Sequence, residues 1–124
     1  MSGAAPKKQS YRELIAWQKA RQFTKTIYEV TAAFPKNETF GLTMQLRRAA
    51  VSIVSNIAEG QARYSKKEFV HFLRNSRGSL AEVETQIIVG EDLGYVTAVD
   101  ARSCLGKADE LNRIMAGLIG SMQE

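Results

Sequence analysis

The chain has 124 residues with 24% charged and 44% hydrophobic side chains and a formal net charge of +4, which suits one ordinary soluble globular domain. Cys104 is the only cysteine, so an internal disulfide is excluded and a reducing, cytoplasmic setting is expected. The N-terminus lacks the apolar core of a secretory signal, and no apolar run approaches the roughly 18 residues that span a bilayer, so no membrane association is expected.

The first predicted helix follows a basic N-terminal stretch. Residues 1–9 are expected to form a flexible basic tail. Ser10 is a good helix N-cap, with Glu13 three residues later completing a capping box. Apolar residues then recur at alternating spacings of four and three as far as Phe34, which is typical of a helix that buries one face in a bundle. Pro35 is expected to end this helix.

The second predicted helix, residues 41–61, is apolar on two faces. One seam of apolar residues spaced by three and four predicts its buried face. A second apolar line lies on another face and consists of Val51, Val54 and Ala58. A helix with two apolar faces needs two neighbours, one of which can come from another subunit. Gly60 is expected to end the helix.

The third predicted helix is long, because Ser65 and Glu68 form another capping box and the helical pattern continues over residues 66–93. Gly78 lies in the middle of this helix at a cost of roughly 1 kcal/mol relative to alanine, which is typical of close backbone approach to a neighbour. The residues that widen its apolar face are Ile88 and Val89.

The fourth predicted helix completes an all-α domain. Gly94 is expected to end the third helix and Thr97 or Asp100 to cap the fourth, whose apolar residues again recur at helical spacing. No segment shows the alternation of a β-strand. The pattern predicts a single domain over residues 10–124, folded as an antiparallel up-down-up-down four-helix bundle with short connections.

Charge is distributed unevenly along the chain. Residues 1–46 carry a net charge of +4 and residues 47–77 a net charge of +5, whereas residues 78–110 carry −5. A polarised chain of this kind fits nucleic acid on one surface, and it fits equally well contacts between opposite patches of neighbouring subunits.

A cluster of basic residues spans the turn after the second predicted helix and the first turns of the third. It consists of Arg63, Lys66, Lys67, Arg74 and Arg77. Tyr64 lies among them and has a ring on which a base could stack. We interpret this cluster as a nucleic-acid-binding surface, against the alternative of a solvated face with internal ion pairs. Several copies in an oligomer would strengthen polyanion binding.

A string of polar residues interrupts the apolar pattern of the second predicted helix and includes Ser52, Asn56 and Glu59. Asn56 and Glu59 are three residues apart and therefore share a face. They form either a binding or catalytic pair or part of a buried structural network that fixes helix register, and we favour the network. An unpaired buried carboxylate would be too costly. The arginines that could pair with Glu59 are Arg47, Arg48 and Arg63.

The sequence offers little for metal binding or catalysis. Glu68 and His71 form a Glu-x-x-His pair, which is half of a di-iron bundle signature, but His71 is the only histidine and one chain cannot complete such a site. A solvated or capping pair is the preferred interpretation. The sequence has no glycine-rich phosphate loop, no cysteine pair for zinc and no nucleophile–base pair. We therefore expect a protein without catalytic residues, bound metal or cofactor.

Six segments in order resemble the signature of one bacterial family. They are WQKA at 17–20, FPKNE at 34–38 with GL at 41–42, QLRRA at 45–49, NIAEG at 56–60 followed by Arg63, GSL at 78–80 and EVET at 82–85. Together they resemble the 23S rRNA intervening-sequence proteins, also called four helix bundle proteins. The sequence departs from that pattern at Val54, where the family often has proline, so the second helix is expected to be straighter here.

The resemblance implies an antiparallel four-helix bundle that assembles into a ring-like homo-oligomer, with a pentamer as the expected form. Genes of this family lie within rRNA intervening sequences, and distant relatives act as accessory proteins of diversity-generating retroelements, in association with nucleic acid and a reverse transcriptase. The expected function is a non-catalytic oligomeric bundle that binds RNA or DNA through its basic surface. The alternative is a structural or protein-binding scaffold without nucleic-acid binding.

Overall fold

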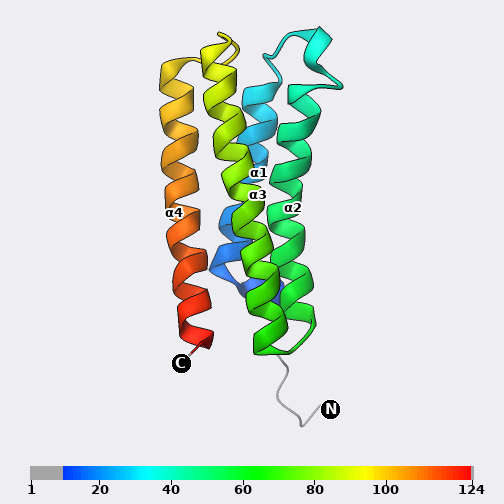
Figure 1. Ribbon diagram of the computed structural model, residues 1–124, viewed down its shortest axis with the longest axis vertical. Helices are drawn as coiled ribbons and strands as arrows, with labels where there is room; N and C mark the ends of the chain where they lie inside the picture. The colour runs from blue at the N-terminus through cyan, green and yellow to red at the C-terminus, as the bar shows by residue number, and fades with distance from the viewer. Residues whose placement is uncertain (1–9, 124) are drawn as a thin grey trace.

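The structure is a computed structural model in which residues 10–123 are described, so the expected tail of residues 1–9 lies outside the described residues. Across residues 10–123 the fold is all-α, with four α-helices and no strand (Figure 1). The helices are α1 (Ile15–Thr31), α2 (Leu42–Ala62), α3 (Lys66–Asp92) and α4 (Ala98–Met122). The short 3₁₀ turns η1 (Tyr11–Glu13) and η2 (Lys36–Glu38) precede α1 and α2. None of the described helices is long and apolar enough to cross a membrane.

Side-chain caps begin α3 and α4 where the sequence predicts them. The Ser65 hydroxyl accepts a hydrogen bond from the Glu68 backbone N–H at 3.3 Å, and the Thr97 hydroxyl accepts one from the Asp100 N–H at 3.1 Å. Each bond satisfies one of the backbone donors that a helix N-terminus leaves unpaired. These two predicted helix starts are confirmed.

The start of α1 differs from the prediction. The Ser10 hydroxyl accepts a hydrogen bond from the Arg12 N–H, but this cap opens η1 instead of a continuous helix. Leu14 then adopts an extended backbone, with φ −73° and ψ 130°, and α1 begins only at Ile15. The prediction that Ser10 caps the first α-helix is therefore wrong, because one extended residue interrupts the helical backbone.

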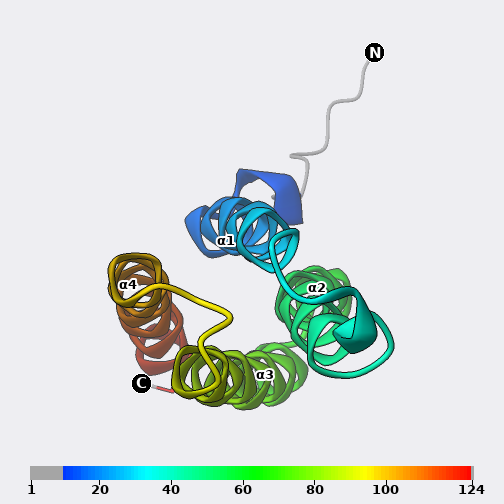
Figure 2. The same cartoon turned by 90° about the horizontal axis from the view of Figure 1, so that it is seen from above.

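One hydrophobic core runs the length of the bundle, with the four helices around it (Figure 2). The apolar residues of α1 that recur at helical spacing are buried as predicted from Ala16 to Ile27, whereas Val30 is only partly buried. The helix ends at Thr31, so the prediction that it continues to Pro35 is wrong. The largest fully buried side chains are Ile27, Leu46, Ile53, Ile57, Leu73, Leu80, Ile87, Leu111 and Met115. Burying a side chain of this size contributes roughly 1.5–3 kcal/mol, so these residues supply much of the driving force for packing the helices.

Gly60 allows α2 and α3 to pack closely and Gly90 allows the α1–α2 and α3–α4 connections to pack on α3, whereas Gly78 makes no close contact. A Cβ atom on Gly60 would lie 2.6 Å from the Phe72 Cβ, and one on Gly90 would lie 3.2 Å from the Val96 side chain. Gly78 is exposed, and a Cβ atom there would meet nothing within 4 Å. The prediction of close approach at Gly78 is wrong, because this glycine faces solvent and Gly60 makes the close contact between α2 and α3.

Gly60 lies inside α2, so the prediction that it ends the helix is also wrong. The helix continues to Ala62, and the chain turns at Tyr64, whose φ of 55° lies in the left-handed region. Gly94 follows α3 as predicted, with a φ of 79°. A residue with a side chain pays a steric cost in this conformation that glycine avoids, so Tyr64 is the less expected of the two.

The bundle has a loop end and a turn end (Figure 1). The loop end carries residues 32–41 and 93–97, which connect α1 to α2 and α3 to α4. The turn end carries residues 63–65, which connect α2 to α3, together with the start of α1 and the end of α4. All four helices therefore contribute to both ends of the core.

Side chains from both connections close the loop end. The Phe34 and Tyr95 rings lie 5.5 Å apart, and the Tyr95 hydroxyl donates to the Glu38 carboxylate at 3.0 Å. The other oxygen of that carboxylate accepts the Leu42 backbone N–H at 3.1 Å, at the first residue of α2. The two connections are thereby bound to each other and to the start of a helix.

Candidate nucleic-acid interface

Three basic side chains at or near the turn end carry unpaired positive charge. Lys66 and Lys67 are the first two residues of α3, and Arg74 follows Lys67 by two helical turns, so those two share one stripe of the helix. All three side chains are exposed, and within residues 10–123 none of them makes a hydrogen bond or an ion pair. Exposed cations without partners remain available to phosphate groups.

The charges of α3 run against its helix dipole. A helix N-terminus favours negative charge and a C-terminus positive charge, by roughly 0.3–1 kcal/mol per exposed side chain at low ionic strength. The helix begins with Lys66 and Lys67 and ends with Glu91 and Asp92, and in its first turn only Glu68 has the favourable sign. This order of charges lowers the stability of α3. Helix stability therefore does not explain why lysines lie at its N-terminus and acidic residues at its C-terminus.

The other two residues of the predicted cluster are held by neighbouring side chains. A terminal nitrogen of Arg63 lies 3.4 Å from the Glu59 carboxylate, and its guanidinium carbon lies 5.2 Å from the centre of the Phe72 ring. Arg77 donates a hydrogen bond from Nε to the Asn112 Oδ1 at 3.0 Å, which directs it toward α4. Of the five predicted residues, three therefore have no bonded partner among the described residues, Arg63 is neutralised by Glu59, and Arg77 keeps its charge while it is bound to a neutral amide.

A polar group joins α2 to α3 along one side of the bundle. The Ser52 and Ser79 hydroxyls lie 3.0 Å apart, and the Asn56 side-chain amide donates to the Ser52 carbonyl at 2.8 Å and to its hydroxyl at 3.0 Å. Among the described residues Glu59 takes no part in this group, since its side chain is 55% exposed and pairs with Arg63. The expectation that Glu59 is buried is wrong, because it falls on the outer face of α2.

Sequence reasoning missed the bonds that Ser76 and Ser79 make across the α2–α3 contact. The Ser76 hydroxyl is fully buried and donates to the Ile53 carbonyl at 2.9 Å. Both serines lie on α3, and their partners lie 23 and 27 residues earlier, on α2. The available signal is a small hydroxyl side chain at a position that otherwise carries an apolar one, since a buried hydroxyl must find a partner.

Sequence reasoning also missed the contacts that Arg47 makes with the end of α1. Its Nε donates to the Thr31 hydroxyl at 2.9 Å, a terminal nitrogen donates to the Tyr28 carbonyl at 3.2 Å, and its guanidinium carbon lies 4.5 Å from the centre of the Tyr28 ring. A cation near the last carbonyls of a helix is favourable. Arg47 therefore stabilises the end of α1, and it is not the partner of Glu59.

Neither His71 nor Cys104 lies in a reactive environment. His71 is exposed, and its ring lies 5.5 Å from the Phe72 ring. Across the described chain, no group of three or more His, Cys, Asp or Glu side chains is placed to hold a metal ion. Cys104 is 1% exposed, and burial raises the pKa of its thiol, an effect that Lys107 opposes. A buried thiol with a raised pKa is a poor nucleophile at neutral pH.

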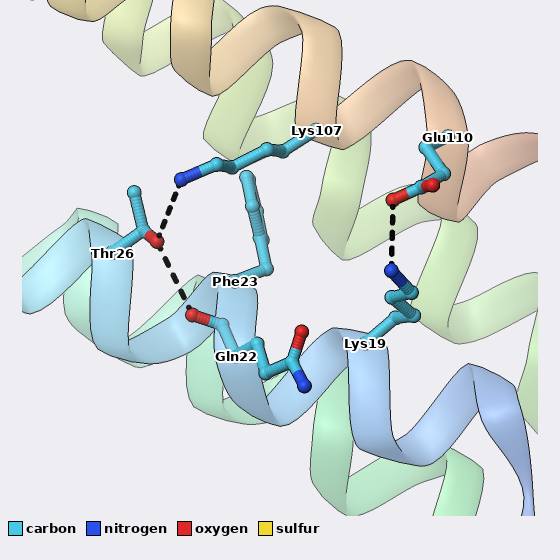
Figure 3. Close-up of a pocket in the computed structure, with 6 residues that line it drawn as sticks. All are labelled: Lys19, Gln22, Phe23, Thr26, Lys107 and Glu110. Carbon is cyan, nitrogen blue, oxygen red and sulfur yellow. Dashed lines mark hydrogen bonds and ion pairs between the residues drawn. The ribbon is translucent and has the colours of Figure 1, made fainter.

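A small pocket between α1 and α4 has its charged groups paired across the two helices (Figure 3). Its volume is about 150 Å³, and Phe23 forms its apolar wall. The Lys19 ammonium lies 3.5 Å from the Glu110 carboxylate, and the Lys107 ammonium donates to the Thr26 hydroxyl at 3.3 Å. Because both lysines are bound across the helix contact, we assign this pocket to helix packing.

Comparison with known proteins agrees with this fold. A solved structure from Bacteroides thetaiotaomicron, described as a protein with unknown function from the S23 ribosomal protein family, is similar with a TM-score of 0.75 and 21% identity. The match covers 85% of this chain and 98% of that one, and it bears on the fold alone. No similar protein was found among curated proteins. Residues 12–117 match the family described as 23S rRNA-intervening sequence protein, and the chain belongs to that family.

Proposed function

We propose that this protein is a non-catalytic, oligomeric helical bundle that binds RNA or DNA through its turn end, in an rRNA-associated or accessory role in the cytoplasm. The observation that carries the proposal is the unpaired charge of Lys66, Lys67 and Arg74, with both lysines placed where the dipole of α3 disfavours them. A bound polyanion would offset that unfavourable charge. Membership of the 23S rRNA-intervening sequence protein family supports a role related to rRNA.

Assembly of several copies would place several turn ends on one particle. The connections alternate between the two ends of the molecule, which supports an antiparallel, up-down-up-down course. Val51, Ile88 and Val89 are 42%, 47% and 41% exposed, so apolar side chains of α2 and α3 remain open to a neighbouring subunit. A ring-like homo-oligomer, with a pentamer as the proposed form, would multiply the binding surface.

The alternative is a structural or protein-binding scaffold without nucleic-acid binding. The observation that favours it is the exposed apolar residues, together with the acidic side chains Glu91, Asp92 and Asp100 near the loop end, which could face the basic turn end of another copy. Complementary charges of this kind would guide self-assembly. The two functions differ in what the basic residues bind, so these residues provide the test.

Fluorescence anisotropy with short RNA and DNA, single-stranded and duplex, tests the proposal. Replacing Lys66, Lys67 and Arg74 by glutamine should lower the affinity by roughly tenfold or more at low salt. The slope of log K against log salt should shrink by about 0.7 per lost phosphate contact on single strands. The melting temperature should hold or rise, because the conflict with the helix dipole is removed.

A matched variant replaces Lys25, Lys36 and Arg102 by glutamine, since these side chains are also exposed and carry the same total charge. It should retain most of the affinity. Equal losses in both variants would show a response to net charge alone and would contradict a binding site at the turn end. Absence of binding at low salt would favour the scaffold, as would loss of assembly in the turn-end variant by analytical ultracentrifugation.

A further inference from the structure

We propose that the turn end contains a binding pocket for one unpaired nucleobase. A mainly apolar pocket of about 270 Å³ opens there. Its walls are Leu14, directly before α1, Phe69 of α3, and Leu118 and Met122 of α4, while Gly60 of α2 contributes backbone only. This inference rests on the proposed function, because it names the part of the nucleic acid that the turn end holds.

The pocket is present because the described segments cover the core only in part at the turn end. Only residues 63–65 join α2 to α3, and three residues are too few to fold over the ends of four helices. Gly60 lies against Phe69 and has no side chain that could fill the space. At the loop end Phe34 and Val96 are 7% and 5% exposed and cover the core. At the turn end Phe69 is equally buried at 7%, and the open part of the pocket is bordered by Leu14, Leu118 and Met122, which are only partly buried.

Positive charge and an aromatic ring lie at the mouth of this pocket. Lys66 and Tyr64 line it, and Lys67 occupies the next position of α3. Glu59 is neutralised by its ion pair with Arg63, which leaves the local charge positive. Tyr64 is 63% exposed and holds a left-handed backbone that is costly for a residue with a side chain. Such strain persists where the surroundings require it, often at binding sites.

A nucleotide matches this combination of an apolar pocket and a cationic rim. Its base is flat and aromatic and packs between the Tyr64 ring and the apolar walls, while its phosphate lies one sugar away, within reach of Lys66 and Lys67. A base that is stacked and paired in a duplex cannot enter such a pocket without leaving the stack. The turn end therefore prefers single strands, loops or bulges over duplexes.

Binding of three RNA probes of equal length tests the pocket: a single strand, the same strand with abasic sites, and its duplex. The native protein should bind the intact single strand roughly tenfold more tightly than the abasic strand, because stacking contributes only where a base is present. Met122→Trp should fill the pocket and remove this difference. Met44→Trp, the same exchange at a partly buried position near the start of α2, should keep it. Lys66→Gln should weaken both strands without changing their ratio.

The outcomes separate this inference from the proposed function. Equal affinity of the native protein for the intact and abasic strands would overturn the pocket while leaving phosphate binding in place. Absence of binding to all three probes would overturn both. Tyr64→Ala gives a second test that does not disturb the core, since Tyr64 is largely exposed. A ratio of affinities unchanged by Tyr64→Ala would also count against the pocket.

Discussion

The loop end and the turn end close the same hydrophobic core in different ways. At the loop end Phe34 and Val96 are buried, and Tyr95 is bound to Glu38 across two connections. At the turn end a connection of three residues, 63–65, leaves an apolar pocket open among the described residues. The two ends therefore differ in how they are closed: a ring contact and a hydrogen bond between two connections close the loop end, and an apolar pocket remains at the turn end.

The same contrast applies to the starts of two helices. At the loop end the Glu38 carboxylate accepts the Leu42 N–H, so negative charge lies at the N-terminus of α2. At the turn end α3 starts with Lys66 and Lys67, which place positive charge at the N-terminus. The first arrangement stabilises a helix and the second does not. Stability therefore explains the charge at the start of α2, whereas it does not explain the charge at the start of α3.

The largest expected effect is the loss of the buried ring at the loop end. Phe34→Ala should lower the free energy of unfolding by about 3–5 kcal/mol, because it removes a large buried side chain that contacts Tyr95. Met122→Ala at the turn end should cost less than half as much, since its side chain borders an open pocket. Urea unfolding of both variants measures the difference. Similar costs would show that the two ends are closed equally well.

An intermediate effect is expected at the glycine that lets α2 and α3 approach each other. Gly60→Ala should cost about 1–3 kcal/mol, because its Cβ would lie 2.6 Å from the Phe72 Cβ and the two helices would have to separate. Gly78→Ala is the matched control and should gain about 0.5–1 kcal/mol, since it improves helix propensity without a contact. Thermal unfolding compares them, and a stabilised Gly60→Ala variant would contradict the close packing described here.

The smallest expected effect concerns the pH response of the loop end. The hydrogen bond to Glu38, and after it burial, raises the pKa of Tyr95 above its ordinary value of 10.0. A pKa that is raised in the folded state stabilises the protonated phenol. This contribution is complete below pH 10.0 and is lost as the pH rises through the folded-state pKa.

Tyr95→Phe should therefore lower the melting temperature slightly at neutral pH and remove the part of its alkaline decline that Tyr95 causes. Thermal melts of the native protein and the variant between about pH 8 and pH 11 measure both effects. Melting temperatures that differ by the same amount throughout this range would show that Tyr95 makes no pH-dependent contribution to the loop end.

Most of the helical architecture could be predicted because the signals that define it are local. The spacing of apolar residues identified the buried face of α1, and Ser65 and Thr97 identified two helix starts, since each cap joins atoms only three residues apart. Gly60 and Gly78 could not be told apart in this way. Whether a helical glycine meets a neighbour depends on which face that neighbour packs against.

In the candidate site, too, features set by neighbouring residues could be predicted, and contacts between residues far apart in the sequence could not. Lys66 and Lys67 were expected to be exposed and they are, because they fall in the first turn after a cap. The bond from Arg77 to Asn112 joins residues 35 apart, and no pattern near Arg77 indicates it. The outward position of Glu59 likewise follows from how α2 packs on its neighbours, which its own sequence does not determine.

Because the charges of α3 oppose its helix dipole, ionic strength should affect both the folding of the protein and its binding to a polyanion. Added salt screens the unfavourable contact of Lys66 and Lys67 with the helix dipole, so the free protein becomes more stable. The same salt weakens any complex with a polyanion, because the counterions released on binding gain less entropy when they enter a more concentrated salt solution. Added salt should therefore raise the stability of the free protein and lower its affinity for a polyanion. Low salt should have the two opposite effects.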